Sequence, residues 1–298
     1  MALKSALRHG LRALGLRFPQ LRRYSGRLGL GRLLTRGQTR EQILVDGDVV
    51  IELDLSVPQF RHYYFNFDLS SAAETVLIRR LVTSSDVFVD VGAHIGYFAL
   101  VAAKYARHVV AFEPSPKTYS YLQRNIQLNK ELASKVTAHL LGLSDHSGTA
   151  TLFYSPEDPG GSSLRPVEWT NTTDETVTLE TLDRVVSARP VAFIKIDVEG
   201  AELDVLRGGR EMISRDHPIV LCELFEPWQQ RFGRTCQDIV GFFRERNYTG
   251  YSVQEEPSRR GRVTVKPLDL TKMDATDVVN ALFVPSARAP KILARLSA

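Results

Sequence analysis

Apolar residues follow two different periods along the chain, and their order predicts repeated strand and helix units from residue 87 onward. Short runs rich in Val, Ile and Phe predict strands, whereas apolar residues three or four apart predict helices. Strands are expected at 87–91, 108–112, 136–141, 149–154, 176–179, 192–196, 219–224, 251–254 and 281–284, and helices at 97–105, 117–129, from 202 and at 236–246. This alternation predicts a mostly parallel sheet with helices on both faces and a ligand beyond the carboxyl ends of its strands.

The first 70 residues form a predicted extension in front of a domain spanning residues 71–298. Leucines three or four apart, with arginines between them, predict a basic amphipathic helix over residues 1–23. We favour a helix that packs against the rest of the protein; a helix on an anionic membrane surface and an arginine-rich transit peptide are the alternatives. An Asp-Gly pair between two β-rich runs predicts a hairpin over residues 43–55, and aromatic residues follow it. The extension is therefore a candidate substrate cap.

Two other segments carry local signals. Helical spacing begins at residue 70, where Ser71 and Glu74 have the spacing of a capping box. Residues 155–174 show neither period and contain three prolines and two glycines. Because a long loop in a compact domain is often a functional lid, this stretch is a candidate substrate loop, with an ordinary surface insertion as the alternative.

Charge is unevenly distributed in a chain of otherwise ordinary globular composition. Residues 1–40 hold ten of the 38 lysines and arginines, and the first acidic residue is Glu41. The rest of the chain has 28 basic and 34 acidic residues, so it offers no general attraction to nucleic acid. A non-catalytic protein that binds a membrane or nucleic acid through residues 1–40 is one alternative class. Salt-sensitive binding to liposomes or RNA without catalysis would identify it.

The cysteine count and hydropathy bear on location. Cys222 and Cys236 form neither a C-x-x-C pair nor a disulfide framework, which fits a reducing compartment. The sequence has no run of 18 apolar residues, and arginines interrupt the N-terminal apolar positions. We expect a cytoplasmic protein whose membrane contact, if it has any, is peripheral and involves residues 1–23. The oligomeric state cannot be inferred from the sequence.

The segment most informative about a ligand follows the strand at 87–91 and reads Asp90-Val-Gly-Ala-His-Ile-Gly96. Glycines allow the backbone to approach a ligand closely. Dinucleotide sites use G-x-G-x-x-G to admit a diphosphate. Here the middle glycine is missing and an acid precedes the turn, which favours a ligand with an ammonium group. A nicotinamide-dependent oxidoreductase is an alternative class of enzyme, and the missing glycine counts against it. The next strand ends at Glu113, 21 residues after Gly92, where a carboxylate can accept both ribose hydroxyls of a nucleoside.

Ionisable residues also gather at the end of the strand at 192–196. Lys195, Asp197 and Glu199 alternate, so they share one face until the strand ends. Buried ionisable groups are costly unless they are paired or functional. A structural ion pair, with Glu223 as a further partner, is an equal alternative for Lys195, whereas we favour a functional role for Asp197.

Together these motifs resemble the FkbM-type methyltransferases. The resemblance covers roughly residues 75–284. The matching segments are Asp90-Val-Gly-Ala-His-Ile-Gly96, Phe112-Glu-Pro-Ser-Pro116, Asn125, Leu143-Ser-Asp-His-Ser-Gly148, Ile194-Lys-Ile-Asp-Val-Glu-Gly-Ala-Glu202 with Leu206-Arg-Gly208, and Leu221-Cys-Glu223. The resemblance implies an α/β fold of the class I methyltransferase type, a Rossmann-like three-layer sandwich. Its sheet would be seven-stranded and mostly parallel, with an antiparallel last strand, and its cofactor would be S-adenosylmethionine.

The resemblance also implies where the cofactor binds. The turn that begins at Asp90 would bracket the methionine part, Glu113 would hold the ribose, and the loop at residues 143–145 would border the adenine. The implied cofactor-binding residues are Asp90, Gly92, Ala93, His94, Gly96, Glu113, Ser144 and Asp145.

Methyl transfer to oxygen requires an aligned hydroxyl and a group that takes its proton. The candidate catalytic residues are Asp197, Glu199 and Lys195. His94 is another candidate base, although we favour a loop residue without a catalytic role. A Mg²⁺ or Mn²⁺ ion held by Asp197 and Glu223 could instead lower the pKa of the hydroxyl. The motif Asp/Asn-Pro-Pro-Tyr/Phe, which would indicate methylation of an amino group, is absent after residue 196. The expected acceptor is therefore a hydroxyl of a sugar, glycolipid or polyketide.

Overall fold

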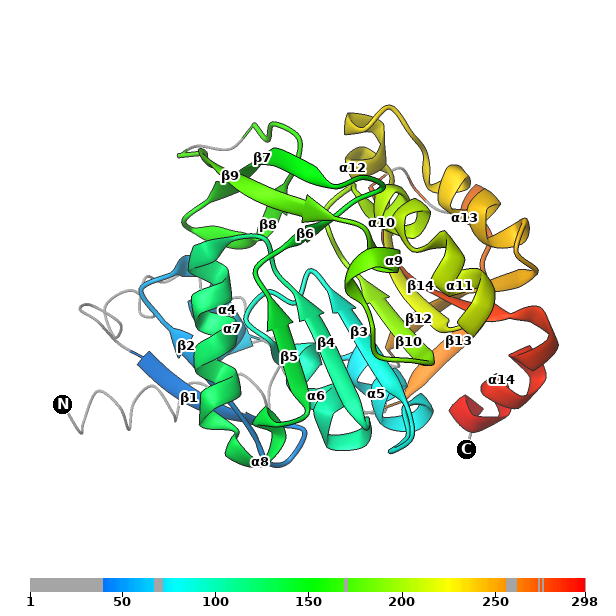
Figure 1. Cartoon of the computed structure of the whole chain (residues 1–298), viewed down its shortest axis with the longest axis horizontal. Helices are drawn as coiled ribbons and strands as arrows, with labels where there is room; N and C mark the ends of the chain where they lie inside the picture. Colours follow the sequence, from blue (N-terminus) through cyan, green and yellow to red (C-terminus); the bar gives the residue numbers. More distant parts are fainter. Residues whose placement is uncertain are drawn as a thin grey trace.

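A computed structural model describes residues 40–66, 72–168, 171–255, 262–272, 274 and 276–297. These residues form a central sheet between two layers of helices, with a second sheet above one end of it (Figure 1). The central strands are β3 (Val87–Val91), β4 (His108–Phe112), β5 (Val136–His139), β10 (Val191–Ile196), β11 (Ile219–Phe225), β12 (Tyr248–Glu255), β13 (Val263–Pro267) and β14 (Val278–Pro285). The predicted strands overlap these, except those at 149–154 and 176–179, which lie in the second sheet and not in the single sheet expected. The predicted three-layer α/β architecture is confirmed.

The central sheet has eight strands in the order β13-β12-β14-β11-β10-β3-β4-β5, so the predicted count of seven is wrong. Its parallel part runs from β11 to β5 and has four parallel pairs. Three antiparallel pairs join β14, β12 and β13 to β11, so the sheet is mixed. The additional strand, β13, is an edge strand that pairs with β12. Its sequence, Val-Thr-Val-Lys-Pro, is short and half exposed, which makes its period weak.

Alternate residues of each central strand belong to two different cores, as period-2 geometry requires. Phe88 faces the core that the helices α5, α6, α7 and α14 cover, whereas Val87 and Val89 face the core beneath α9, α10, α11 and α13. These helices span Ala73–Leu81, Tyr97–Tyr105, Pro116–Leu128 and Ala289–Ser297 on the first face, and Leu182–Val185, Glu202–Gly208, Arg210–Asp216 and Cys236–Arg244 on the second. The two short helices α8 (Lys130–Ala133) and α12 (Glu226–Arg231) complete the connections. None of the described helices is long and apolar enough to cross a membrane.

The second sheet lies beyond the carboxyl ends of β3, β4 and β5 (Figure 1). It has the order β6-β9-β7-β8, with bounds Gly142–Leu143, Thr173–Glu180, Gly148–Ser155 and Asp158–Ser163. The expectation of a loop over residues 155–174 is wrong in part, because β8 lies inside it and pairs antiparallel with β7. The sequence of β8, Asp-Pro-Gly-Gly-Ser-Ser, has low β propensity, so this strand depends on its partner rather than on its own side chains.

The predicted hairpin is confirmed. It consists of β1 (Arg40–Val45) and β2 (Val49–Asp54), which pair antiparallel, and the helix α4 (Pro58–Asn66) follows it. Asn125 and Asn129 of α7 accept backbone N–H groups of β2 at 2.8 Å, which ties the hairpin to the central domain.

The predicted capping box does not start the next helix. The N-cap of α5 is Ala72, which makes no capping hydrogen bond through its side chain. Ser71 and the predicted helix at residues 1–23 lie outside the described residues. The 3-10 turns at Leu270–Lys272 and Ser286–Arg288 flank β14.

Candidate active site

A cavity of about 450 Å³ lies at the carboxyl ends of β3, β4, β10 and β11, where open α/β sheets bind ligands. It brings together eight of the residues singled out from the sequence: Gly92, Ala93, His94, Glu113, Lys195, Asp197, Glu199 and Glu223. They come from four strand ends that are far apart in the sequence. The predicted convergence of these ends is thus confirmed, whereas the role of each residue stays a prediction.

The turn after β3 passes very close to the end of β10. Gly92 has a φ of +78°, and a Cβ there would overlap the carbonyl oxygen of Asp197. The N–H of Asp197 donates to the carbonyl of Val91 at 3.1 Å, and the N–H of Ala93 donates to the carbonyl of Phe112 at 2.9 Å. A side chain at Gly92 would therefore separate the two strand ends that form the floor of the cavity.

Glu113 lies at the end of β4 with its carboxylate facing this turn. One oxygen accepts the N–H of His94 and the other accepts the N–H of Ser115, each at 3.0 Å. Burial raises the pKa of Glu113 to about 7, although the two N–H groups favour the charged form. Since each oxygen has a second lone pair, the carboxylate can accept two further hydroxyl groups from a ligand.

His94 belongs to the turn after β3 and packs against helix α4. Its ring centroid is 5.6 Å from that of Phe60 and 6.3 Å from that of Tyr63. Its Nε2 atom is buried without a hydrogen-bond partner among the described residues. Burial lowers the pKa of His94 to about 4, so the imidazole is neutral at physiological pH. A neutral imidazole of such low basicity is a poor candidate for the base, and a hydrogen bond to a ligand is the better interpretation.

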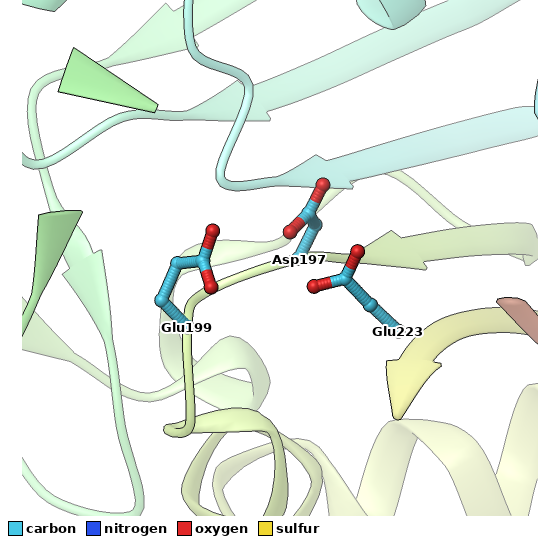
Figure 2. A group of neighbouring side chains, drawn as sticks. All are labelled: Asp197, Glu199 and Glu223. Atoms are coloured by element: carbon cyan, nitrogen blue, oxygen red, sulfur yellow. The ribbon is translucent and has the colours of Figure 1, made fainter. Parts of the chain in front are cut away.

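Three carboxylates face one another on the other side of the cavity (Figure 2). Asp197, Glu199 and Glu223 each offer an oxygen, and these oxygens lie within 4.8 Å of one another. Burial, followed by the charge of Asp197, raises the pKa of Glu199 to about 10 and that of Glu223 to about 8. Both glutamates therefore bind a proton more readily than an exposed glutamate does.

Lys195 is the ammonium group of this cluster. Its Nζ atom donates to Oδ2 of Asp197 at 3.0 Å and lies 4.7 Å from the ring centroid of Phe98. Burial opposes the charge, but Asp197 and then Asp90 outweigh it and raise the pKa of Lys195 above its ordinary value. The side chain of Lys195 is 4% exposed and that of Asp197 is 36% exposed, so the carboxylate is the partner that a ligand can reach.

The loop that carries Glu199 is held in place by Glu202. The buried carboxylate of Glu202 accepts the N–H groups of Val198 and Gly200, both at 3.2 Å for one oxygen, and the side-chain amide of Gln229 at 2.5 Å. Glu199 itself has a φ of +53°, which is uncommon for a residue with a side chain. Glu202 therefore keeps the loop in a conformation that directs Glu199 into the cavity.

Four predicted cofactor-binding residues do not line the cavity. Asp90 is fully buried, and its oxygens lack hydrogen-bond partners among the described residues. Burial raises its pKa to about 6, with Lys195 opposing this. Gly96 is the N-cap of α6 and faces Leu122. The backbone of the remaining two, Ser144 and Asp145, lies next to Gly208, and the wall of the cavity here consists of residues 141–143.

The sequence named no single residue on one side of the cavity, although it marked the residues before 70 as a candidate substrate cap and residues 155–174 as a candidate substrate loop. Gln59 and Tyr63 of α4, residues 158–162 of β8 and Trp228 of α12 also line it. The signals available were an aromatic cluster after the hairpin and a long segment rich in glycine and proline. Neither signal indicates which strand end the segment will cover.

Comparison with known proteins identifies a family whose match includes most of the residues that line the cavity. The family described as Methyltransferase FkbM domain matches residues 90–249. The chain is 34% identical to methyltransferase sdnD of Sordaria araneosa over 49% of its own length and 68% of that protein. It is also 34% identical to the hexuronic acid methyltransferase AglP of Haloferax volcanii, over 41% of this chain and 49% of that protein.

A solved structure resembles the chain more distantly. It is the methyltransferase FkbM from Methylobacillus flagellatus, with a TM-score of 0.48 and 19% identity over 75% of this chain and 54% of the other. The central domain accounts for the match to the family, because residues 90–249 include the ends of β4, β10 and β11 and the whole of the second sheet. Helix α4 precedes the matched residues.

Proposed function

The chain belongs to the FkbM methyltransferase family, and we propose that it transfers a methyl group from S-adenosylmethionine to a hydroxyl of a small molecule or glycan. One observation carries this proposal. A single cavity joins a carboxylate suited to a nucleoside, Glu113, with a group of carboxylates suited to a hydroxyl, around Asp197. Its volume of about 450 Å³ falls in the range of small-molecule sites.

The residues on the β3 and β4 side fit S-adenosylmethionine. Glu113 has lone pairs left for two ribose hydroxyls after it has accepted the N–H groups of His94 and Ser115. His94 lines the same cavity, and its buried Nε2 atom has no partner among the described residues. The turn lacks the G-x-G-x-x-G spacing that admits a diphosphate. S-adenosylmethionine would supply a methyl group already activated on a sulfonium sulfur.

The residues on the β10 and β11 side would orient the acceptor and take its proton. Asp197 is the preferred base, because its carboxylate is accessible while Lys195 fixes one of its oxygens at 3.0 Å. An acceptor hydroxyl that donates to the other oxygen would be held in place and lose its proton as the new C–O bond forms. Lys195 acts here as a positioning residue for Asp197. Glu199 and Glu223, protonated or charged, can bind neighbouring hydroxyls of the acceptor.

The same carboxylates are also a candidate site for Mg²⁺ or Mn²⁺. Asp197, Glu199 and Glu223 could supply three oxygen ligands, the type that hard divalent cations prefer. A bound cation would lower the pKa of the acceptor hydroxyl. However, the ammonium of Lys195 already neutralises Asp197. We therefore favour the metal-free arrangement, in which Asp197 acts as the base.

A sugar acceptor is supported by one relative, which is named a hexuronic acid methyltransferase. The direct test is methyl transfer from labelled S-adenosylmethionine to a panel of sugars, glycolipids and polyketides, with the product identified by mass and by the methylated position. Calorimetry with S-adenosylhomocysteine tests the cofactor part separately. Methylation of an amino group, or no binding of S-adenosylhomocysteine, would contradict the proposal.

A further inference from the structure

The acceptor side of the cavity has a roof that is built from two segments far apart in the sequence. The N–H of Gly160 in β8 donates to the side-chain oxygen of Gln59 in α4 at 3.0 Å. The backbone N–H of Gln59 donates to the carbonyl of Glu157 at 3.1 Å. These two hydrogen bonds join the N-terminal segment to the second sheet, so α4 and β8 together cover the carboxylates of the central sheet.

This roof presents both aromatic and acidic groups to the cavity. Tyr63 comes from α4, and Trp228 of α12 faces the same space from the side of the central domain. Asp158 begins β8 and lies at the exposed rim, where it adds a carboxylate to the lining. An acceptor would thus lie between aromatic side chains, with acids beneath it and at the opening.

The charges that line this side are strongly unbalanced. Among the described residues that line the cavity, the acceptor side has four carboxyl groups, those of Asp158, Asp197, Glu199 and Glu223, and one ammonium group, that of Lys195. Lys195 is already engaged with Asp197. An incoming anion would meet no free cation in this lining to balance its charge, whereas each hydroxyl of a neutral compound can donate to a carboxyl oxygen.

We propose that the acceptor is an uncharged compound rich in hydroxyl groups, such as a neutral glycoside, and that the site selects it against the matching uronate. This inference rests on the proposed function, because it concerns the acceptor of the same methyl transfer. Hydroxyl groups would donate to Asp197 and its neighbours, and the less polar face of the sugar ring would pack against Tyr63 or Trp228.

The test compares matched acceptors that differ in charge alone. Labelled methyl transfer is measured with 4-nitrophenyl glycosides of several neutral sugars, with the corresponding uronides, and with the glycoside of an amino sugar. We expect kcat/KM for a neutral glycoside to exceed that for its uronide by at least tenfold. Equal or better transfer to a uronide, or a preference for the amino sugar, would overturn the proposal.

Binding of S-adenosylhomocysteine, measured by calorimetry, separates this inference from the proposed function. Loss of that binding would contradict the proposed function. If S-adenosylhomocysteine binds but no neutral glycoside in the panel is methylated, the acceptor class alone is wrong.

A charge reversal at the rim tests whether the acidic lining causes the selection. Asp158→Lys should reduce the preference for the neutral glycoside by about three- to tenfold, because it places a cation where a uronate would enter. Glu157→Lys is the matched control. Glu157 is the adjacent residue, its side chain is exposed, and it does not line the cavity. S-adenosylhomocysteine should bind both variants with the affinity of the parent protein. A third variant, Asp158→Asn, should also bind it with that affinity, which would show that β8 tolerates the loss of this carboxylate. An unchanged preference in Asp158→Lys would overturn the electrostatic explanation.

Discussion

The two sides of the cavity hold their acids in different ways. On the β3 and β4 side, Glu113 accepts a backbone N–H on each oxygen, so its position is fixed before a ligand arrives. On the β10 and β11 side, three carboxylates lie within 4.8 Å of one another with Lys195 as their counter-charge. The first arrangement suits a group that holds hydroxyls in a fixed position. The second suits groups that exchange protons, because small changes in their surroundings alter their ionisation.

The largest effect should come from the proton-exchanging side. Asp197→Asn is expected to lower kcat by ~10²–10⁴-fold, the usual contribution of a general base, while the affinity for S-adenosylhomocysteine changes less than threefold. Turnover and calorimetry on the same preparation test this. Asp174→Asn, an exposed substitution on β9, is the matched control. Full turnover of Asp197→Asn would remove Asp197 from the mechanism and make Glu199 the next residue to test.

The opposite side should respond in binding. Glu113→Ala is expected to weaken both S-adenosylmethionine and S-adenosylhomocysteine by about a hundredfold or more, because it removes two charge-assisted hydrogen bonds worth about 1.5–3 kcal/mol each. Titration calorimetry measures the effect. Glu131→Ala, an exposed change on α8, should leave both affinities unchanged. If Glu113→Ala bound both ligands with the affinity of the parent protein, Glu113 would not hold the ligand on the β3 and β4 side.

The pH dependence of binding sharpens the same comparison. Burial raises the pKa of Glu113 to about 7 in the free protein. Ribose hydroxyls donate to the charged carboxylate, so the ligand binds the deprotonated form. Affinity for S-adenosylhomocysteine should therefore be constant well above pH 7 and fall by up to about tenfold for each pH unit below it. Glu113→Gln should bind more weakly at high pH and show a flatter profile between pH 5.5 and 8. A profile that Glu113→Gln leaves unchanged would assign the titration to another group.

The two sides also differ in how well the sequence predicts them. The β3 and β4 side is one continuous stretch in which each strand, turn and helix has its own local signal, from Asp90 to Glu113. The clustering of Asp197 with Glu223 followed from the shared edge of parallel strands. The two segments of the roof were predicted as a candidate cap and a candidate loop, but their contact could not be predicted, because Gln59 meets Gly160 across 101 residues and β8 has no propensity to form a strand alone.

Backbone packing explains the remaining differences between the predicted and observed sites. Gly96 and Ser144 matched the family pattern, yet they lie against Leu122 and Gly208 rather than in the cavity. A sequence motif contains both the residues that touch a ligand and those that allow neighbouring segments to pack closely, and spacing alone does not separate the two kinds. The eighth strand, β13, was missed because its exposed edge position leaves little hydrophobic periodicity.

The smallest expected effect concerns metal dependence. The Nζ atom of Lys195 lies 3.0 Å from Oδ2 of Asp197, so an ammonium group already balances the charge that would attract a divalent cation. Prolonged chelation should therefore change kcat by less than about twofold, since the metal-free mechanism requires a base and an aligned hydroxyl rather than a Lewis acid. The measurement is turnover after dialysis against EDTA, followed by addition of Mg²⁺ or Mn²⁺, with S-adenosylhomocysteine affinity as the control for intact protein.

Activity that is lost with the chelator and restored by either ion would instead assign Asp197, Glu199 and Glu223 to metal coordination. Glu199→Gln and Glu223→Gln should then weaken the dependence on added Mn²⁺, whereas in the metal-free arrangement their effect would appear in KM for the acceptor.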